Sequence, residues 1–383
     1  MEREGRECGA ATRPGRAIPR DAIRAVEQIV DDVVARGLDA ALEYSRRLDG
    51  TAPEKPLVEP RPGGSREVVS AALEIARALE TFYRKLVPSG AADYYNGVLR
   101  LVVWKPVRAV ALYVPARYIS TLVMLAVPAR VAGVERVYVV TPPKGAAPEI
   151  LAVARELGVA AVVPLGGPHG LAYAAFHLGV DMIAGPGGLY VQAAKYVLSQ
   201  YVGIDGIEGP TELAVYAEGV DAEVAMRGVL AQLEHGPASL AYFISPDERL
   251  IRRAEEIYAR ERTSSMGPLK TLRVAGADEA VRVIDEIAPE HLEVWGRREV
   301  AYRVRNAGAV SVNMPSPYLD YAAGISHVLP TGGSAKWRGI ITPSTFMKPI
   351  GIAEAVGRLE LAREASVLAE YEGFAHHRKA LRP

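Results

Sequence analysis

Apolar residues recur every three or four positions in two segments near the start of the chain, residues 21–48 and 66–86. This spacing predicts amphipathic helices, and Gly37 interrupts the first of them. A stretch rich in proline and glycine at 53–64 separates the two segments and predicts a break between them.

From residue 99 onward the pattern changes, and short runs rich in valine, leucine and tyrosine alternate with alanine-rich stretches. The predicted strands lie at 108–114, 136–141 and 160–165 and begin near 213 and 240, and predicted helices lie between them, near 120–132 and 147–157. Strands that alternate with helices are typical of parallel sheets covered by helices. The predicted fold class is therefore α/β, with two doubly wound, Rossmann-like parallel-sheet domains, a helical N-terminal segment and an extended C-terminal tail.

The composition argues against several classes of protein. The 383 residues include 45 Lys+Arg and 45 Asp+Glu, so the chain has no excess of basic charge for binding nucleic acid. A single cysteine, Cys8, excludes an intrachain disulfide and a CxxC pair, and favours a cytoplasmic location. The sequence has no run of about 18 apolar residues without charge, so no membrane span is predicted. The charged first residues are unlike a signal peptide and predict a basic arm.

The scarcity of thermolabile residues is a second feature of the composition. Asparagine occurs 3 times and glutamine 4 times, and arginine outnumbers lysine by 36 to 9. These counts are expected of a protein from a thermophile, and they are equally expected of a GC-rich genome.

Three loops follow predicted strands and offer glycine or polar residues, at 113–121, 164–170 and 184–188. Open parallel sheets bind ligands beyond the carboxyl ends of their strands, so these loops are the first places to expect a ligand. None of them contains the GxGxxG pattern. Their glycines either let a phosphate approach the backbone or only form turns.

Two pairs of polar residues are candidates for chemistry. Gln232 and His235 lie three residues apart at the end of a predicted helix, so both side chains share one face. They are either metal ligands or a helix cap whose histidine interacts with the helix dipole. Glu290 and His291 are adjacent, and a carboxylate beside an imidazole suits proton transfer near neutral pH. Exposed neighbours of this kind also occur without any function.

Asp320, His327, Glu372 and His377 are further polar candidates, and they lie in two later segments of the chain. Gln232, His235, Asp320 and His377 together would form a set of oxygen and nitrogen ligands that suits zinc. Their spacing is not a local zinc motif, so only the folded chain could bring them together.

Several segments, in their order along the chain, resemble the successive motifs of the histidinol dehydrogenase family. They are LYVP with STLVMLAVPARVAGV, GPTE, LAQLEHGP, IAPEHLE, LDYAAGISHVLPTGG and EGFAHH. The resemblance implies a cytoplasmic zinc enzyme of histidine biosynthesis that uses two NAD to oxidise L-histidinol, through the aldehyde, to L-histidine. It also implies a homodimer in which the tail of each subunit completes the active site of its partner.

The resemblance implies a role for each matching residue. The zinc ligands would be Gln232, His235, Asp320 and His377. Glu290 would activate water for aldehyde oxidation, and His291 would shuttle protons. The substrate would be bound by Ser120, Thr211, His327 and Glu372, and NAD by Tyr113, His169 and Gly188.

The chain departs from the family pattern mainly on the cofactor side. A loop is shortened to residues 116–119, His169 stands for a glutamine, and Gly188 stands for an asparagine. On the substrate side, Ser316 replaces an acidic residue. Two alternatives therefore stay open: a zinc and NAD dehydrogenase of another small alcohol, and a non-redox paralogue that binds metal and a small molecule. The retained pair of glutamate and histidine argues against the paralogue.

These assignments divide the chain into four parts. We expect an N-terminal arm at 1–20, a discontinuous metal and substrate domain at 21–112 and 211–335, a nucleotide domain at 113–210, and a C-terminal tail at 336–383. Residues from about Lys336 onward show no strand pattern and cannot form a core alone, so the tail is expected to dock on another domain or another subunit. The resemblance implies that it docks on the partner subunit.

Overall fold

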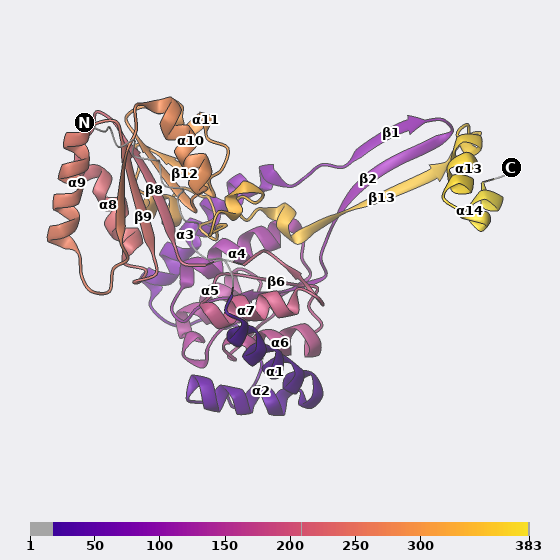
Figure 1. Cartoon of the computed structure of the whole chain (residues 1–383). Helices are drawn as coiled ribbons and strands as arrows, with labels where there is room; N and C mark the ends of the chain where they lie inside the picture. Colours follow the sequence, from indigo (N-terminus) through magenta and orange to yellow (C-terminus); the bar gives the residue numbers. More distant parts are fainter. Residues whose placement is uncertain (1–17, 208, 382–383) are drawn as a thin grey trace.

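Two parallel sheets of five strands each form the body of the molecule, and a third, antiparallel sheet extends from it as an arm (Figure 1). The computed structural model describes residues 18–207 and 209–381. The predicted α/β class with two parallel-sheet domains is confirmed. Cys8 and most of the expected arm at 1–20 lie outside the described residues. Within the part of the chain that is described, no helix is long and apolar enough to cross a membrane.

The first sheet has the strand order β5-β4-β3-β6-β7, and all neighbouring strands are parallel. Its strands are β3 (Ala109–Tyr113), β4 (Arg136–Val140), β5 (Ala161–Val163), β6 (Met182–Ala184) and β7 (Gly203–Ile204). Along the chain, β4 and then β5 are added on one side of β3, and β6 and then β7 are added on its other side. The strand order therefore reverses at β3 and β6, where sheets of this kind bind ligands beyond the carboxyl ends of their strands.

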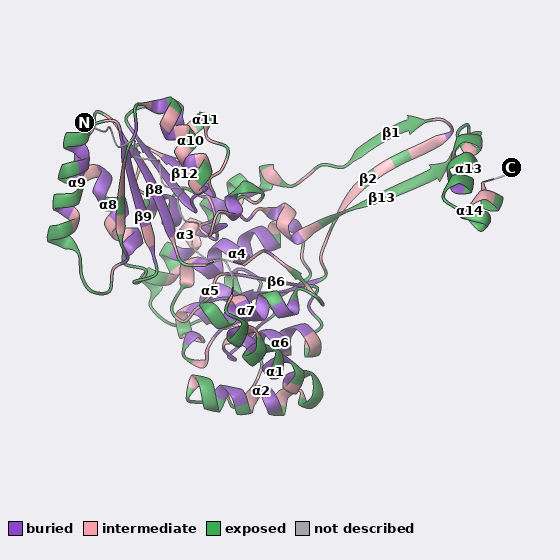
Figure 2. Cartoon of the chain, in the orientation of Figure 1, coloured by how far each residue is buried: buried purple, intermediate pink, exposed green. Residues whose placement is uncertain are grey.

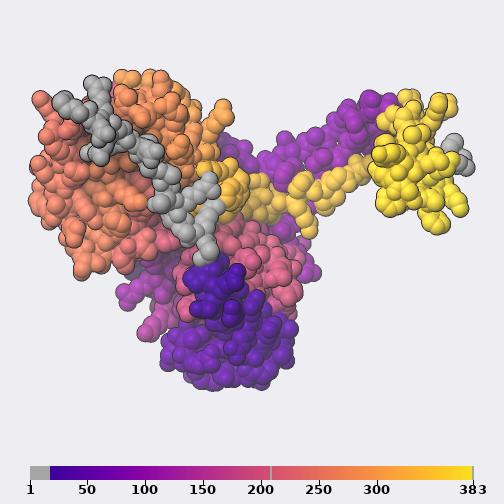
Figure 3. Space-filling model, viewed as in Figure 1, coloured from indigo at the N-terminus to yellow at the C-terminus, as the bar shows by residue number. Residues whose placement is uncertain are grey.

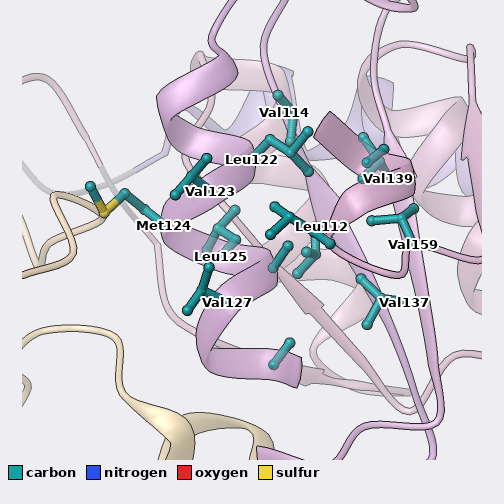
Figure 4. Packing of buried hydrophobic residues seen from close by; sticks show 14 of the residues in the cluster. Leu112, Val114, Leu122, Val123, Met124, Leu125, Val127, Val137, Val139 and Val159 are labelled. Carbon is teal, nitrogen blue, oxygen red and sulfur yellow. The ribbon is translucent and has the colours of Figure 1, made fainter. Parts of the chain in front are cut away.

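Helices cover both faces of the first sheet. One face carries α1 (Arg20–Arg36), α2 (Leu38–Tyr44), α6 (Gly167–His177) and α7 (Leu189–Leu198), and the other carries α3 (Arg66–Tyr83), α4 (Ile119–Ala132) and α5 (Pro148–Glu156). Alternate residues of β3 enter the two cores, with Val110 and Leu112 on the side of α4 and Ala111 on the side of α6. Figure 4 shows Leu122 of α4 beside Leu112. α4 is apolar all round because α3 covers its outer side.

The N-terminal helices pack on this first sheet, which corrects the predicted domain boundaries. Val26 and Val33 of α1 share a core with α6 and α7, and Leu79 of α3 shares a core with α4 and α5. The predicted grouping of residues 21–112 with 211–335 is therefore wrong for these helices. Helical periodicity shows that one face of a helix is buried, but it does not identify the sheet that covers that face.

The second sheet has the strand order β10-β9-β8-β11-β12 and is also parallel throughout. Its strands are β8 (Glu212–Ala217), β9 (Leu240–Ser245), β10 (Leu269–Arg273), β11 (His291–Trp295) and β12 (Ala309–Val312). One face carries α8 (Ala222–Leu233) and α9 (Glu248–Glu261), and the other carries α10 (Ala277–Ile287) and α11 (Glu299–Arg303). Figure 2 shows the central strand β8 buried along its length. The short helix α12 (Ser316–Tyr321) follows β12.

The C-terminal segment contains a long strand, so the prediction of a tail without strands is wrong. β13 (Met347–Ala355) pairs with β2 (Val98–Pro106), which pairs with β1 (Ala91–Tyr95), and all pairs are antiparallel. The helices α13 (Ala362–Tyr371) and α14 (Ala375–Ala380) lie at the far end of this sheet (Figure 1). Nearly every residue of β13 is exposed, so its sequence lacks the alternation that marks a half-buried strand.

The arm, which comprises β1, β2, β13, α13 and α14, exposes many large apolar side chains. Figure 3 shows it protruding from the body of the molecule. Its exposed apolar residues are Tyr94, Tyr95, Val102, Ile350, Ile352, Val356, Leu359, Leu361, Val367, Leu368, Tyr371 and Phe374. Apolar residues gathered in this way are typical of a surface that another protein covers.

Tyr83, at the end of α3, ties the segment after α12 to the first domain. Its side chain is fully buried, and its hydroxyl donates to the carbonyl oxygen of Ile341 at 2.7 Å and accepts the backbone N–H of Ser326 at 2.9 Å. Val328 and Phe346 join the core beneath the same helix. The chain that leads from the second sheet to the arm is therefore anchored on the first domain.

Replacing Tyr83 by phenylalanine tests this anchor. We expect Tyr83→Phe to lower the free energy of unfolding by about 2–4 kcal/mol, because two buried backbone groups lose their hydrogen-bond partner. Equilibrium denaturation in guanidinium chloride measures the loss. Tyr302→Phe is the matched control, since Tyr302 is 73% exposed, and it should leave the midpoint unchanged. Equal midpoints for both variants and the wild type would contradict the anchoring role.

Candidate active site

The polar residues of the candidate site gather at the amino-terminal edge of the second sheet. α8 connects β8 to its parallel neighbour β9 and therefore runs back along the sheet, which brings its last turn and Gln232 to the edge where β11 begins at His291. α12 brings Asp320 to the same place. The expectation that ligand sites follow the carboxyl ends of strands is therefore wrong for this cluster, because Gln232 and His235 lie at the end of a helix and not at its start.

Gln232 and Asp320 are in direct contact. The amide Nε2 of Gln232 donates to Oδ2 of Asp320 at 2.9 Å and to Oγ of Ser316 at 3.1 Å. Both amide hydrogens are used, so the amide oxygen faces away from these two partners. The second carboxylate oxygen of Asp320, Oδ1, is buried and accepts no hydrogen bond. These two oxygen atoms are available to a cation.

Two histidines beside this contact are held by backbone carbonyl groups. Nδ1 of His235 lies 3.1 Å from the carbonyl oxygen of Gln232, and Nδ1 of His327 lies 2.8 Å from that of Asp320. Because a carbonyl oxygen only accepts, Nδ1 carries the proton in both rings and Nε2 is the acceptor. Nε2 of His235 can therefore bind a metal ion. Nε2 of His327 lies 3.4 Å from Oγ1 of Thr121.

Glu290 and His291 lie against the same cluster, and both are buried. Nε2 of His291 is 3.5 Å from Oδ1 of Asp320 and 4.0 Å from Oε1 of Glu290. The other carboxylate oxygen of Glu290 accepts the backbone N–H of Glu212 at 3.0 Å. The pair predicted to move protons thus lies beside the carboxylate that is predicted to bind metal.

Burial shifts the charge state of the cluster. It lowers the pKa of His291 to about 3, and the nearby His327 and His235 act in the same direction. It raises the pKa of Asp320 to about 7, and the neighbouring Glu293 adds to this rise. His291 is therefore neutral near pH 7. A bound cation would stabilise the carboxylate form of Asp320.

Gln232, His235 and Asp320 fit zinc or a similar divalent ion. They offer oxygen and nitrogen donors without a thiolate, and Asp320 Oδ1 is a buried polar atom whose hydrogen-bonding capacity no protein group satisfies. Within residues 18–207 and 209–381, no three His, Cys, Asp or Glu side chains form a metal-binding group. The three candidate ligands that lie together therefore include a glutamine, Gln232. The fourth predicted ligand, His377, does not lie with them.

His377 and Glu372 do not reach this cluster within one chain. Glu372 follows α13 and His377 lies in α14, at the far end of the arm (Figure 1), and both residues are exposed. The ring of His377 packs against Phe374 of the same helix pair, with centroids 5.1 Å apart. The structure therefore brings together three of the four predicted metal ligands and leaves the fourth on the arm.

The first domain reaches the cluster through the start of α4. Thr121, which contacts His327, lies in the first turn of this helix beside the predicted substrate residue Ser120. Thr211, the other predicted substrate hydroxyl, is half-buried and directly precedes Glu212, whose N–H binds Glu290. Thr121 was not predicted as a site residue from the sequence. The only indication in the sequence was that Thr121 follows Ser120, a predicted substrate residue, in a loop between a predicted strand and a predicted helix.

The residues predicted to bind NAD all follow the carboxyl ends of strands in the first sheet. Tyr113 ends β3 and is buried, and the exposed Gly188 caps α7 after β6. His169 lies in the first turn of α6 and is 1% exposed, with Nε2 at 3.1 Å from Oδ2 of Asp49 and its ring stacked on Tyr44. His169 is thus buried beside Asp49, whose carboxylate also accepts the backbone N–H of Gly166 at 3.2 Å.

Comparison with known proteins identifies the family. The sequence profile of histidinol dehydrogenase matches residues 13–383. A histidinol dehydrogenase of Pyrobaculum aerophilum is 73% identical over 367 residues, which cover 96% of this chain and 100% of the relative. One from Sulfolobus acidocaldarius is 38% identical and covers 93% and 94% of the two chains. The chain belongs to the histidinol dehydrogenase family.

Solved structures support the same fold. The crystal structure of histidinol dehydrogenase from Elizabethkingia anophelis superposes with a TM-score of 0.85 over 96% of this chain and 93% of that chain, at 23% identity. An NAD-dependent aldehyde dehydrogenase from Sinorhizobium meliloti superposes with a TM-score of 0.53 at 16% identity, covering 88% and 82%. These two superpositions show the fold, and the profile match and the 73% identical relative confirm the resemblance of the sequence motifs to the histidinol dehydrogenase family.

A buried ion pair in the first domain was not predicted from the sequence. Nζ of Lys195 lies 2.6 Å from Oδ1 of Asp205, and both side chains are almost completely buried. Nζ of Lys195 donates to the carbonyl oxygen of Gly185 at 2.9 Å. Oδ2 of Asp205 accepts the backbone N–H of the same glycine at 2.7 Å. The ion pair therefore binds both backbone polar groups of Gly185, the first residue of the loop after β6. A lysine on the apolar face of α7, between Val191 and Leu198, was the signal in the sequence.

Breaking this pair should destabilise the protein. We expect Asp205→Asn to cost about 3–5 kcal/mol, because the buried ammonium group of Lys195 loses the carboxylate that lies 2.6 Å away. The double variant Lys195→Met/Asp205→Leu, which removes both charges, should recover much of the loss. Calorimetric melting temperatures of the three proteins provide the test. A double variant that is no more stable than Asp205→Asn would show that loss of the carboxylate opposite the buried Lys195 ammonium group is not the cause.

Proposed function

We propose that this protein is a zinc-dependent histidinol dehydrogenase that oxidises L-histidinol through the aldehyde to L-histidine and transfers two hydrides to two NAD. The observation that carries the proposal is the contact of Asp320 with Gln232 on one side and with His291 of the buried pair Glu290 and His291 on the other, in a chain of this family. The single cysteine and the biosynthetic reaction suit a cytoplasmic enzyme.

Zinc would be held by Gln232, His235 and Asp320 of one subunit and His377 of the other, and when bound it supplies a Lewis acid that polarises the substrate hydroxyl. We assign the proton that the hydroxyl loses to His291, because its Nε2 lies 3.5 Å from Asp320 and the ring is uncharged before the reaction. Glu290, held at one oxygen by the N–H of Glu212, directs its other oxygen toward His291 and takes the proton of the water that adds to the aldehyde.

The hydride acceptor would bind at the carboxyl edge of the first sheet, near Tyr113 and Gly188. Thr121 and the adjacent Ser120 begin α4 at that edge, and Thr121 already contacts His327 in the metal cluster. This contact joins the nucleotide side to the substrate side. His169 is buried beside Asp49, so its contribution to NAD binding is indirect.

A homodimer accounts for the arm. Glu372 and His377 lie on an exposed apolar surface of the arm and have no place in the site of their own chain. In a symmetric dimer, each arm covers the other subunit and delivers both residues to its site. The same contact would bury the exposed apolar residues of the arm.

A dehydrogenase of another small alcohol is the second candidate function. Ser316 stands where the family has an acidic residue, and its side chain is buried against Gln232. A substrate without the amino group of histidinol would need no carboxylate there. The discriminating observation is the rate with L-histidinol relative to alcohols that lack this amine.

Formation of NADH from L-histidinol tests the proposed function directly. The zinc-loaded wild type should reduce two NAD for each histidinol consumed, and Glu290→Gln should slow the aldehyde step by about 100-fold or more. Product analysis by chromatography should find histidine. Turnover of simpler alcohols without turnover of L-histidinol would favour the second candidate.

Zinc affinity should depend on pH. The carboxylate of Asp320 binds zinc only when it is deprotonated, and burial raises its pKa to about 7. Below this pH zinc must displace a proton, so its affinity should fall by about tenfold for each pH unit. Competition with a chelator between pH 5.5 and 8.5 measures this dependence. An affinity that is constant over the range would exclude Asp320 as a ligand.

Mixing two inactive variants tests the shared site. Glu290→Gln and His377→Ala should each be inactive, but a heterodimer would contain one site with both defects and one site with neither. After dissociation and reassociation, activity should return to about half of the wild-type value for each heterodimer formed. The control is each variant carried through the same procedure alone. Heterodimers that form and stay inactive would show that each subunit supplies its own tail.

A further inference from the structure

Glu293 is a buried carboxylate that the proposed mechanism does not use. It lies on β11 two residues after His291, so both side chains point to the same side of the sheet, and it is fully buried. Oε1 accepts the backbone N–H of Ser316 at 2.6 Å, and Oε2 accepts the indole N–H of Trp295 at 2.9 Å. Burial of a carboxylate costs free energy even when it is hydrogen-bonded, so this position calls for a physical reason.

Gly228 provides the space for this carboxylate. It lies on α8 one turn before Gln232, and a Cβ atom at this position would overlap the carboxylate of Glu293. Glu293 therefore lies against the backbone of α8 and at the start of α12. These two helices carry Gln232 and Asp320.

Ser316 connects Glu293 to Gln232. It is the first residue of α12 and precedes Asp320 by four positions, so both side chains lie on one face of that helix. The hydroxyl oxygen of Ser316 accepts an amide hydrogen of Gln232, which leaves the hydroxyl hydrogen for another acceptor. Glu293 is the acceptor that we assign to this hydrogen, because its carboxylate already accepts the backbone N–H of Ser316 at 2.6 Å.

We propose that Glu293 is a positioning residue for the metal site, which holds the Gln232 amide through Ser316 so that the amide oxygen points toward the metal. This inference rests on the proposed function, because it takes Gln232 as a metal ligand. Rotation of the Gln232 amide by half a turn would exchange its oxygen and nitrogen and remove the donor atom. Asp320 Oδ2 and the hydroxyl oxygen that Glu293 orients both accept hydrogen bonds, so both require the nitrogen.

Zinc affinity of the full-length dimer tests the proposal. Groups that orient a metal ligand typically change metal affinity by about 10- to 100-fold, and we expect a loss of this size in Glu293→Gln and in Ser316→Ala. Equilibrium competition with a chromophoric chelator measures it. The double variant Glu293→Gln/Ser316→Ala should lose no more zinc affinity than the weaker-binding single variant, because both substitutions release the same contact. In cobalt-loaded protein, the visible absorption bands should shift in both variants, since the ligand oxygen is displaced.

Trp295→Phe is the matched control. It removes the other hydrogen bond to the same carboxylate and leaves the contact with Ser316, so its zinc affinity and cobalt spectrum should match the wild type even if its melting temperature falls. Wild-type affinity in Glu293→Gln and Ser316→Ala, or an equal loss in Trp295→Phe, would overturn the proposal. If Glu293→Gln does not fold, Ser316→Ala decides, because it removes only a small buried hydroxyl.

Gln232→Ala separates this inference from the proposed function. If Gln232→Ala keeps the wild-type zinc affinity, the metal assignment fails and the inference fails with it. If Gln232→Ala loses zinc while Glu293→Gln and Ser316→Ala do not, the metal assignment stands and the positioning role is wrong.

Discussion

Burial of the Asp320 carboxylate is the constraint on which the rest of the site depends. Withdrawal from water raises its pKa to about 7, and one of its oxygen atoms accepts no hydrogen bond from the protein. A positive partner is therefore needed to hold this group charged. The amide nitrogen of Gln232 donates to Asp320 and Ser316, so its amide oxygen is left to bind the same cation. Burial also keeps the adjacent His291 neutral, so one physical cause sets the charge state of both groups.

The site lies where two different sheet edges meet. The first sheet presents the carboxyl ends of β3 and β6, and the second presents the amino-terminal ends of β8 and β11. The segment anchored by Tyr83 keeps the domains together, and Thr121 contacts His327 across the junction. Hydride transfer requires the nucleotide and the alcohol to lie side by side, and this junction would place them so. In the proposed function, the arm adds the remaining ligand from a second chain, which makes dimerisation a condition for activity.

Much of this architecture could be predicted from the sequence, because alternating strands and helices leave a strong pattern and the motifs are specific. The buried runs at 108–114 and 136–141 became β3 and β4. The partner of each element could not be predicted, since periodicity does not say which sheet covers α1 and α3. β13 was missed because an exposed strand has no alternation. In the site, residue types and motifs selected Gln232, His235 and Asp320. Hydrogen bonds between distant segments, such as those of Glu293 with Ser316, exist only in the folded chain.

Anomalous diffraction at the zinc edge from crystals of the zinc-loaded dimer tests the central claim most directly, that one metal site is assembled from two chains. The account predicts one anomalous peak per subunit, at about 2.0–2.3 Å from Gln232, His235 and Asp320 of one chain and from the partner's His377. A peak whose fourth protein ligand is His377 of the same chain, or a zinc ion bound away from Asp320, would contradict it.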